Sequence, residues 1–391
     1  MSFSMGSASG PIPSRPACGS GRKLAFAAAI LSVSQLIPLL AAPADARTRY
    51  YSRERPEPAA NITPTRQPEG PLQIVISLGS QRLWVYDKVG LLETSIVSTG
   101  VGGYPTPTGV FAVIDKEKTH YSNIYRGAPM PNMQRLTMSG VALHSGVTTG
   151  RPASHGCIRM PHAFSIKMFN LTQLGVRVVI ATEDTKPQEI AHARLFVRKP
   201  VPPPEELDMM TAKGVAVASA TAMTEAVANV KVGKITAWRA GVLRALPISV
   251  MISKTEGKVF VRHGFRQILE APAVIRDGDR PLGTHVYTAL EFRDGGDAMR
   301  WQAVSVPESG QSTANSRKDS RASRSEAEPP FQVASGPPST AAEALDRIEL
   351  PQEVVDRISE MLAPGTSMIV SDHGHNREMR AVGTDFIVLT R

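Results

Sequence analysis

A single stretch of the sequence gathers side chains that can carry out covalent chemistry. Between residues 144 and 160 it holds one thiol, Cys157, two imidazoles, His144 and His155, and several hydroxyls. The cysteine is the strongest candidate nucleophile, because its thiolate forms at accessible pH when a base lies near. An imidazole can serve as that base, since its pKa lies near neutrality. The stretch therefore predicts nucleophilic catalysis by Cys157.

The residues that flank the thiol favour acyl transfer. Gly156 immediately precedes Cys157, and a glycine lets the backbone turn tightly and brings amides near a reacting carbonyl. Such amides can form an oxyanion hole. A helix expected to begin near Pro161 would add some positive potential about one turn away. We therefore expect backbone N–H groups of this loop to stabilise a negatively charged intermediate.

Two other interpretations of the same residues are open. A lone cysteine is often a buried apolar side chain, although this one follows His155 and Gly156. Zinc binding by His144, His155 and Cys157 is the second, but the paired-ligand spacings typical of zinc sites are missing from the sequence. We expect no metal and no cofactor. Three further histidines are expected to be surface or satisfied side chains: His120, His162 and His263.

The first residues of the chain have the pattern of a secretory signal peptide. Arg22 and Lys23 precede an apolar run over 24–40, and the small residues of 44–46 provide a cleavage site. A transmembrane anchor is the alternative, but it needs about 20 apolar residues and this run is interrupted. We therefore expect residues 1–46 to be removed on export, which places the protein in the periplasm or cell envelope.

Removal of this leader changes the cysteine count. Cys18 would leave with it, so Cys157 would be the sole cysteine of the mature chain. In an oxidising compartment an unpaired cysteine is either an intermolecular bridge or a working thiol. No apolar segment precedes Cys18, which argues against a lipoprotein. The cysteine count thus favours a chemical role for Cys157.

Composition and charge limit the class of protein. The chain has 391 residues, 42% of them hydrophobic, with 31 Pro and 31 Gly and a formal net charge of +9. That length suits two modest domains with linkers, and the charge suits an anionic polymer or a membrane surface. The basic residues are scattered, and no zinc finger, RNP motif or basic helix is present, so we expect no nucleic acid partner.

Residues 71–183 predict a mostly β domain that positions the reactive stretch. A proline-rich tether over 47–70 precedes it. The predicted strands are 72–78, 82–86, 93–99, 110–114, 140–143 and 176–181, the first two joined as a hairpin. One main helix is predicted between Pro161 and Gly175. His144 would then stand at the end of a strand and Cys157 in a loop before the helix.

Residues 184–245 predict a linker and a helix. Four prolines occupy 200–204, and an alanine-rich stretch over 209–230 has helical propensity. A β-rich region over 246–391 follows. Within it, about 305–342 is rich in Ser, Arg, Pro and Ala and is predicted to be a disordered insertion.

The region 246–391 repeats landmarks of 71–183. Ile76 and Ile252 stand at matching places in two β-turn-β patterns, 252 − 76 = 176 residues apart. The order of a Pro-x-Gly turn, a proline before a helix and a glycine before a strand also recurs. The second region lacks a thiol, and its polar run Asp372-His373-Gly374-His375 is expected to be loop. We interpret 246–391 as a degenerate copy of the catalytic fold.

The run Ser154-His155-Gly156-Cys157-Ile158-Arg159 resembles the signature of the L,D-transpeptidase catalytic domain, or YkuD family, which pairs it with an upstream histidine. His144 fits that histidine, and the run 105–109 also fits. The resemblance is strong over about 71–183 and weak over 246–391. Two departures are a short spacing, 157 − 144 = 13, and Arg159, where some members have Asn.

The resemblance implies a β-sandwich-like fold and a role for each residue of the stretch. Cys157 would be the nucleophile and His144 the general acid and base, oriented by Ser145. His155 would shape the loop, and the amides of Gly156 and Cys157 would hold the oxyanion. Substrate contacts are expected from three side chains: Ser154, Arg159 and Tyr104.

The resemblance also implies the substrate, which is a peptidoglycan stem peptide. Cys157 would form a thioester with a tetrapeptide stem, release D-Ala and pass the acyl group to an amine of a second stem. Three alternatives are open: hydrolysis as an L,D-carboxypeptidase, anchoring of a protein to the wall, and non-catalytic wall binding. An envelope protein partner through the C-terminal repeat is a further expectation, and the oligomeric state is not specified.

Overall fold

The computed structural model describes residues 64–199, 237–307 and 337–390, apart from short gaps at 126, 294–295, 297, 375, 377 and 379–382. We call residues 64–183 the first lobe and the described residues from 184 onwards the second lobe. The predicted leader, most of the tether and the helix predicted over 209–230 lie outside the described residues. Within the described ranges, no helix is long and apolar enough to cross a membrane.

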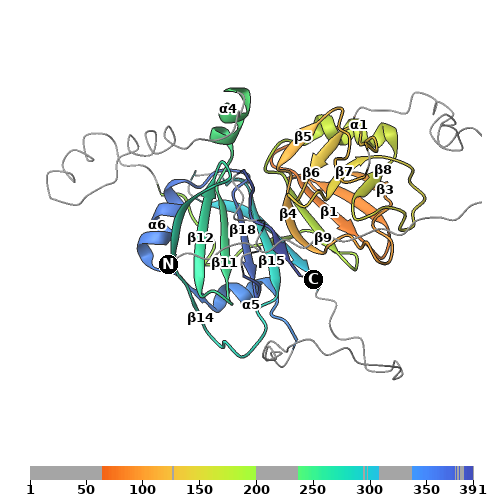
Figure 1. Ribbon diagram of the computed structural model, residues 1–391. Coiled ribbons are helices and arrows are strands. Elements are labelled where there is room, and N and C mark those ends of the chain that lie inside the picture. Colours follow the sequence, from red (N-terminus) through yellow and green to blue (C-terminus); the bar gives the residue numbers. More distant parts are fainter. Residues whose placement is uncertain are drawn as a thin grey trace, which may run out of the picture. The chain divides into compact units, whose positions relative to one another are not determined.

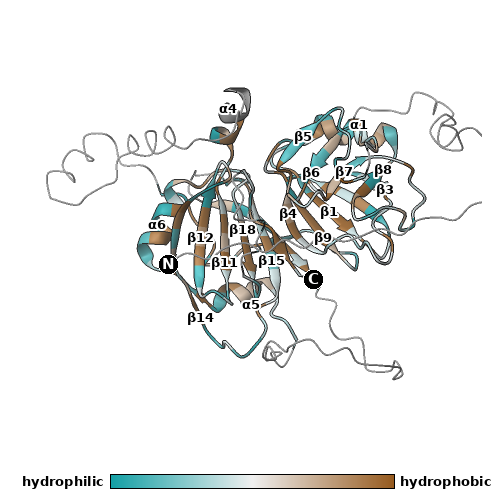
Figure 2. Ribbon diagram, viewed as in Figure 1, coloured by the Kyte–Doolittle hydropathy of each residue, from teal (hydrophilic) through white to brown (hydrophobic). Residues whose placement is uncertain are grey.

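The main sheet of the first lobe has the order β19-β4-β9-β1-β2-β3 (Figure 1). Its strands are β1 (Gln73–Ser77), β2 (Arg82–Tyr86), β3 (Leu91–Ile96), β4 (Gly109–Ala112), β9 (Arg177–Ala181) and β19 (Val388–Leu389). Every residue of β1 and β9 is buried, and these strands run parallel. Parallel strands covered on both faces carry continuous apolar runs rather than alternating ones, which is the pattern of both segments and makes them largely brown in Figure 2.

A second sheet carries the reactive stretch. Its order is β5 (Asp115–Glu117), β6 (Met133–Arg135), β7 (Ala142–Ser145) and β8 (Ile158–Met160). Buried residues of both sheets share one hydrophobic core with the helix α1 (His162–Leu171). The predicted mostly β, sandwich-like fold with one main helix is confirmed in the first lobe.

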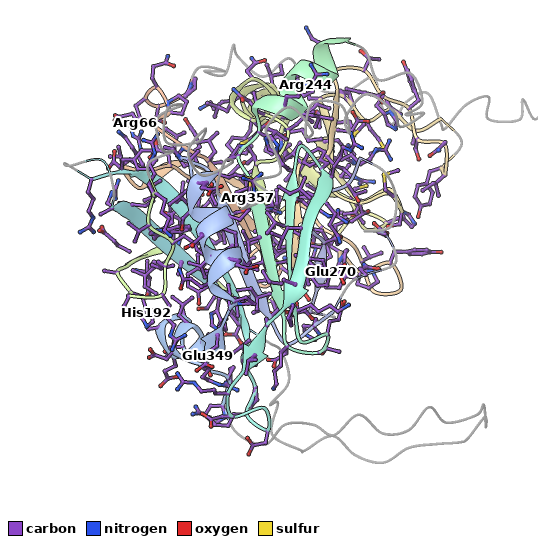
Figure 3. The ribbon with its side chains drawn as sticks, turned by 90° about the vertical axis from the view of Figure 1, so that its left-hand side faces the viewer. Arg66, His192, Arg244, Glu270, Glu349 and Arg357 are labelled. Carbon is purple, nitrogen blue, oxygen red and sulfur yellow. The ribbon has the colours of Figure 1, made fainter. Side chains whose placement is uncertain are left out.

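The second lobe is built around a seven-stranded sheet of order β10-β16-β15-β18-β11-β12-β13. These strands are β10 (Gln188–Ile190), β11 (Ser249–Ser253), β12 (Lys258–His263), β13 (Arg266–Pro272), β15 (Thr284–Phe292), β16 (Met299–Val306) and β18 (Ser367–Ser371). The helices are α4 (Ala237–Ala245), α5 (Ala341–Asp346) and α6 (Gln352–Glu360), and a small ladder joins β14 (Val274–Ile275) to β17 (Ile348–Glu349). Polar side chains on its surface pair locally. Arg357 bonds Glu360 at 2.8 Å and Glu270 bonds Lys258 at 2.7 Å, and Figure 3 labels Arg357 and Glu270.

The two sheets have the same arrangement of five strands. β4-β9-β1-β2-β3 corresponds to β15-β18-β11-β12-β13, with one parallel pair in the same place. The hairpin pairs Ser77 with Arg82 and Ser253 with Lys258 coincide under the offset of 176, since 253 − 77 = 258 − 82 = 176. Irregularities in register also fall at matching places, after Val85 and after Val261. This likeness supports the proposed repeat, which stays a prediction.

The lobes differ where the reactive stretch lies. Within the described part of the second lobe, no four-stranded sheet corresponds to β5–β8. The Asp372 carboxylate of the predicted loop accepts hydrogen bonds from the amides of Leu282 and Gly283, at 2.8 and 2.6 Å. It therefore holds the turn before β15 in place.

The chain ends its path by returning to the first lobe. In β19, Val388 and Leu389 pair antiparallel with Val110 and Gly109 of β4. Gly109 is required by this approach, because a Cβ there would lie 1.9 Å from the Val388 carbonyl oxygen, and its φ is +141°. The sequence did not predict this strand.

Several predicted boundaries are wrong. α1 ends at Leu171 rather than near Gly175, because Thr172 takes extended dihedral angles and its N–H bonds the Met168 carbonyl. Residues 64–70 pack on the first lobe instead of forming a free tether: the Arg66 guanidinium bonds the carboxylate of Asp87.

The predicted linker and insertion are also shorter than expected. Residues 188–190 form the edge strand β10 of the second lobe, paired with β16. Residues 305–306 belong to β16, where each gains a partner on β15. Thr340 begins α5 with a reciprocal capping box to Glu343, so the last residues of the predicted insertion are ordered. Residues 308–336 lie outside the described ranges.

Candidate active site

Two parallel strands bring the predicted nucleophile and base together. His144 lies in β7, paired with Arg159 of β8, and Leu143 pairs with Ile158. Continuing this register by one residue sets Cys157 beside Ala142. Side chains alternate between faces along a strand, so Cys157, His144 and Arg159 share one face. The spacing of 13 residues is thus closed by strand pairing.

The Cys157 thiol is half-buried. Its Sγ lies 3.5 Å from the carbonyl oxygen of Gly140, to which the thiol donates. Burial raises the pKa of Cys157, while a backbone hydrogen bond from Ala142 and the positive charge of Arg159 offset part of that rise. The resting side chain at neutral pH is therefore the thiol, and a base must remove its proton during the reaction.

The His144 imidazole is poised as that base. Its Nδ1 lies 2.7 Å from the carbonyl oxygen of Ser145, which can only accept, so Nδ1 carries the proton and Nε2 keeps its lone pair. Burial lowers the pKa of His144 to about 4, and the charge of Arg159 lowers it further. The ring is therefore neutral at pH 7. No hydrogen bond between His144 and Cys157 is found among the described residues, and such contacts are often long before substrate binds.

Ser145 orients His144 by its backbone. The Ser145 hydroxyl lies on the opposite face, 3.0 Å from Nδ1 of His162. The prediction that Ser145 holds the base is thus met by its carbonyl oxygen, not by its side chain. His162, expected to be a satisfied surface histidine, is exposed and bonded to this hydroxyl.

The loop before the thiol is held by Ser154. Its hydroxyl accepts from the Gly156 amide at 3.2 Å and donates to the carbonyl of Cys157. Ser154 is only 1% exposed, so its predicted role in substrate binding is wrong: it fixes the loop instead. Because the Gly156 amide is engaged, its predicted share in an oxyanion hole is wrong too, and that role stays a prediction for the Cys157 amide. Gly156 has φ +108°, a value that favours glycine.

Thr106 is a second loop anchor that the sequence did not single out. Its buried hydroxyl donates to the Gly156 carbonyl at 2.9 Å and accepts from the Gly100 amide at 2.8 Å. It thus ties the turn over 100–106 to the residue before Cys157. The run 105–109 was recognised as fitting the family, but nothing local in it marks this hydroxyl.

His155 lies in an aromatic cluster on the surface. Its ring centroid is 4.6 Å from that of Tyr104, nearly edge-on, and 5.1 Å from that of Tyr125. Both tyrosines are exposed, by 53% and 43%. Tyr104 is therefore available to a substrate, as predicted for it, and His155 is held by ring contacts beside the thiol loop. Tyr125 was missed, because its segment carries no motif.

Arg159 holds the loop from below. Its Nη1 donates to the carbonyl of Ala153 at 3.0 Å, and its backbone bonds Ser98 in both directions. The expected role in loop positioning fits this contact. Its charge also acts on both Cys157 and His144.

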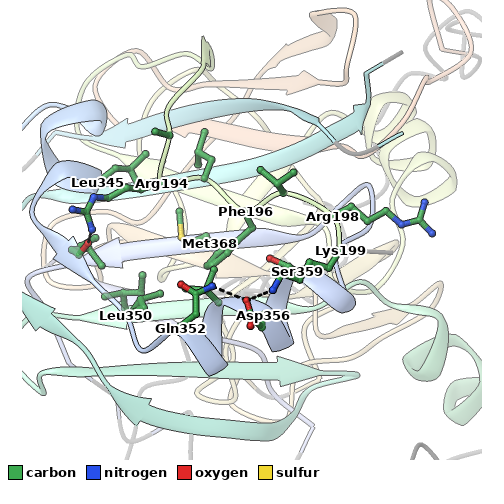
Figure 4. Close-up of a pocket in the computed structure, with 16 residues that line it drawn as sticks. Arg194, Phe196, Arg198, Lys199, Leu345, Leu350, Gln352, Asp356, Ser359 and Met368 are labelled. Atoms are coloured by element: carbon green, nitrogen blue, oxygen red, sulfur yellow. Dashed lines mark hydrogen bonds and ion pairs between the residues drawn. The ribbon is translucent and has the colours of Figure 1, made fainter. Parts of the chain in front are cut away.

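Two larger cavities lie apart from these residues. One, of about 460 Å³, lies in the second lobe between the segment 193–199 and α6, and Figure 4 shows Asp356 bonded to Gln352 and Lys199 at its rim. The other, of about 570 Å³, is lined by both lobes. In the described part of the chain, no three His, Cys, Asp or Glu side chains gather as a metal site would require.

Solved structures with similar folds are L,D-transpeptidases. One from Stackebrandtia nassauensis has 28% identity, covers 29% of this chain and 57% of its own, and gives a TM-score of 0.27. One from Xylanimonas cellulosilytica has 24% identity, 30% and 63% coverage and a TM-score of 0.27. One from Mycobacterium smegmatis has 20% identity, 28% and 58% coverage and a TM-score of 0.27. This chain spans less than two thirds of each. No curated protein matches it.

The family comparison gives a match over the first lobe. Residues 71–180 match the family model of the YkuD L,D-transpeptidase catalytic domain. That range contains β7, β8 and the loop between them, with the thiol and the neutral imidazole on one face. Residues 71–180 therefore form an L,D-transpeptidase catalytic domain of the YkuD family.

Proposed function

We propose that the first lobe is a cysteine acyltransferase that cross-links peptidoglycan stem peptides. The observation that carries the proposal is the pairing of β7 with β8, which sets a neutral imidazole with a free Nε2 on the same face as the only described cysteine. A thiol and a neutral base so placed suit nucleophilic acyl transfer.

The reaction begins on the bond between the L-centre of a diaminoacid and the terminal D-Ala of a tetrapeptide stem. His144 takes the thiol proton as Sγ of Cys157 attacks the carbonyl carbon. The C–N bond then breaks, the proton passes from His144 to the leaving nitrogen, and D-Ala departs. A thioester to Cys157 remains.

The second half transfers the acyl group to an amine of another stem. That nitrogen attacks the thioester carbon as His144 removes its proton, the C–S bond breaks, and Cys157 recovers its thiol. The products are a 3–3 cross-linked dimer and free D-Ala. Tyr104 and His155, both exposed beside the loop, are the proposed walls for the donor stem.

Purified protein incubated with defined tetrapeptide muropeptides tests this proposal. Mass spectrometry should find dimers, and intact-mass analysis should find an acyl adduct on the protein. Cys157→Ala should lose both, while His162→Gln, on the opposite face of β7, should keep both. Trimmed tripeptides without dimers would identify water as the acceptor, and full cross-linking by Cys157→Ala would refute the assignment.

We also propose that the protein acts in the periplasm or envelope, after removal of residues 1–46. The support is the charged, apolar and small-residue pattern of that segment. Fractionation with N-terminal sequencing of the mature chain tests it, and a chain that keeps its first residues in the cytoplasm would contradict it.

A further inference from the structure

The cavity of about 570 Å³ is lined by matching positions of the two lobes. Gly175 and Gly365 both line it, as do Arg177 and Ser367, and each pair is 190 residues apart, since 365 − 175 = 367 − 177 = 190. Arg177 begins β9 and Ser367 begins β18, so the same ends of two corresponding strands meet there. None of the predicted catalytic residues lines this cavity.

A buried guanidinium lies among the residues that line it. Arg177 is 3% exposed and uses Nε on Ser367 at 2.8 Å, and Nη2 on Ser249 and Asp385 at 2.6 and 2.9 Å. Its Nη1 has no hydrogen-bond partner among the described residues, and neither has the hydroxyl of Thr288, which is 2% exposed. The cavity lining thus offers donors that an additional acceptor would satisfy.

The charge of this cluster favours an anionic acceptor. The Asp385 carboxylate is already engaged, by Arg177 and Ser249 at one oxygen and by the Phe386 amide at the other. A second buried guanidinium, Arg262, acts electrostatically on both Asp385 and Arg177. Two guanidinium groups and one carboxylate leave one positive charge in excess. Planar guanidinium groups bind carboxylates with particular strength.

Other side chains that line the cavity are apolar. They come from the end of α1, from α4 and the segment after it, and from the turn after β12: Leu171, Leu174, Val242, Leu246 and Phe265. A ligand that satisfies both parts needs an anionic head and a short hydrocarbon body. A cavity of this size holds a small molecule of that kind.

We propose that this cavity binds a small aliphatic monocarboxylate, whose oxygens accept from Nη1 of Arg177 and from the Thr288 hydroxyl. Arg177 belongs to the first lobe and Thr288 to the second. The bound carboxylate therefore joins the two lobes, and it should raise the thermal stability of the whole chain, because it binds the folded protein only.

Titration of the full chain with acetate, butyrate and hexanoate tests the proposal, with sodium chloride at equal ionic strength as the reference. Calorimetry should give affinity that rises with chain length, by roughly fourfold for each added methylene that is buried. Butyrate should raise the melting temperature, and inorganic phosphate should do so less, because it lacks a hydrocarbon body. Equal effects of butyrate and chloride would overturn the proposal.

Two variants locate the site. Thr288→Val keeps the shape of the side chain and removes the hydroxyl, and it should weaken butyrate binding by about tenfold. Arg177→Gln should abolish it. Arg276→Gln, in an exposed ion pair with Glu349, is the matched control and should bind as the original protein does. If Arg177→Gln fails to fold, the Thr288 variant decides alone, and unchanged binding by that variant refutes the site.

Discussion

Replacing Thr106 by valine should separate positioning of the thiol loop from its chemistry. The Thr106 hydroxyl is the link between the Gly100 amide, at 2.8 Å, and the Gly156 carbonyl, at 2.9 Å. Valine has nearly the same shape, so the substitution removes these two hydrogen bonds without opening a cavity. The residue that it frees, Gly156, directly precedes Cys157 and holds φ +108°.

The expected cost follows from the two groups left behind. A buried polar group without a partner costs about 1–3 kcal/mol, and Gly100 is only half-buried, so its amide regains some hydration. We therefore expect a loss of about 2–4 kcal/mol in the free energy of unfolding. Misplacement of a nucleophile by about 1 Å can cost up to about a hundredfold in rate, so kcat should fall by about tenfold to a hundredfold.

The assay measures formation of the acyl adduct on Cys157 by intact mass, beside unfolding in urea. Thr106→Ser keeps the hydroxyl and should restore most of the rate. Thr94→Val changes an exposed threonine of β3 in the same lobe and should leave rate and stability unchanged. A valine variant that acylates at the original rate would refute the positioning argument, as would a serine variant as slow as the valine one.

Three further predictions concern protonation and packing. Burial raises the pKa of Cys157, so its alkylation by iodoacetamide should keep accelerating up to pH 9; Arg159→Gln should shift that profile to higher pH, whereas a plateau near neutrality would contradict a resting thiol. Asp87 has a pKa of about 2 because hydrogen bonds, led by that from Arg66, outweigh the effect of burial, so it stabilises the fold above pH 4 and loses this as pH falls towards 2. Asp87→Asn should cost about 2 kcal/mol at pH 7 and little at pH 2 in urea melts, and an equal cost at both would contradict the ion pair. Gly109→Ala places a Cβ 1.9 Å from the Val388 carbonyl, so proteolysis should release the chain end, unless β19 does not pair there.

Much of the first lobe could be predicted, because its signals are local. The buried strands are continuous apolar runs, and the hairpin between β1 and β2 has its turn in the sequence. The contiguous run around Cys157 identified the nucleophile, and the histidine at the end of a strand identified the base. The ends of elements were less certain, as Thr172 shows, since a single residue's dihedral angles stopped α1 early.

The roles of individual polar groups could not be predicted. Ser154 and Thr106 both carry hydroxyls near the motif, but whether a hydroxyl meets substrate or backbone depends on loops that approach from elsewhere. Thr106 contacts a residue 50 positions away. Tyr125 joins the cluster around His155 in the same manner. Side-chain type gave the chemistry available, and proximity gave its use.

The sequence by itself determined which side chain reacts and which strands carry it, because a thiol, an imidazole and period-two patterns are properties of short segments. Only the tertiary structure decided the state of that thiol and base, since burial and the charge of Arg159 set their pKa values. It also decided that the chain closes on itself. The bond between Thr390 and Thr108 spans 282 residues, and the ion pair of Arg177 with Asp385 spans 208. Contacts over such separations leave no local pattern, because they are set by the packing of complete sheets.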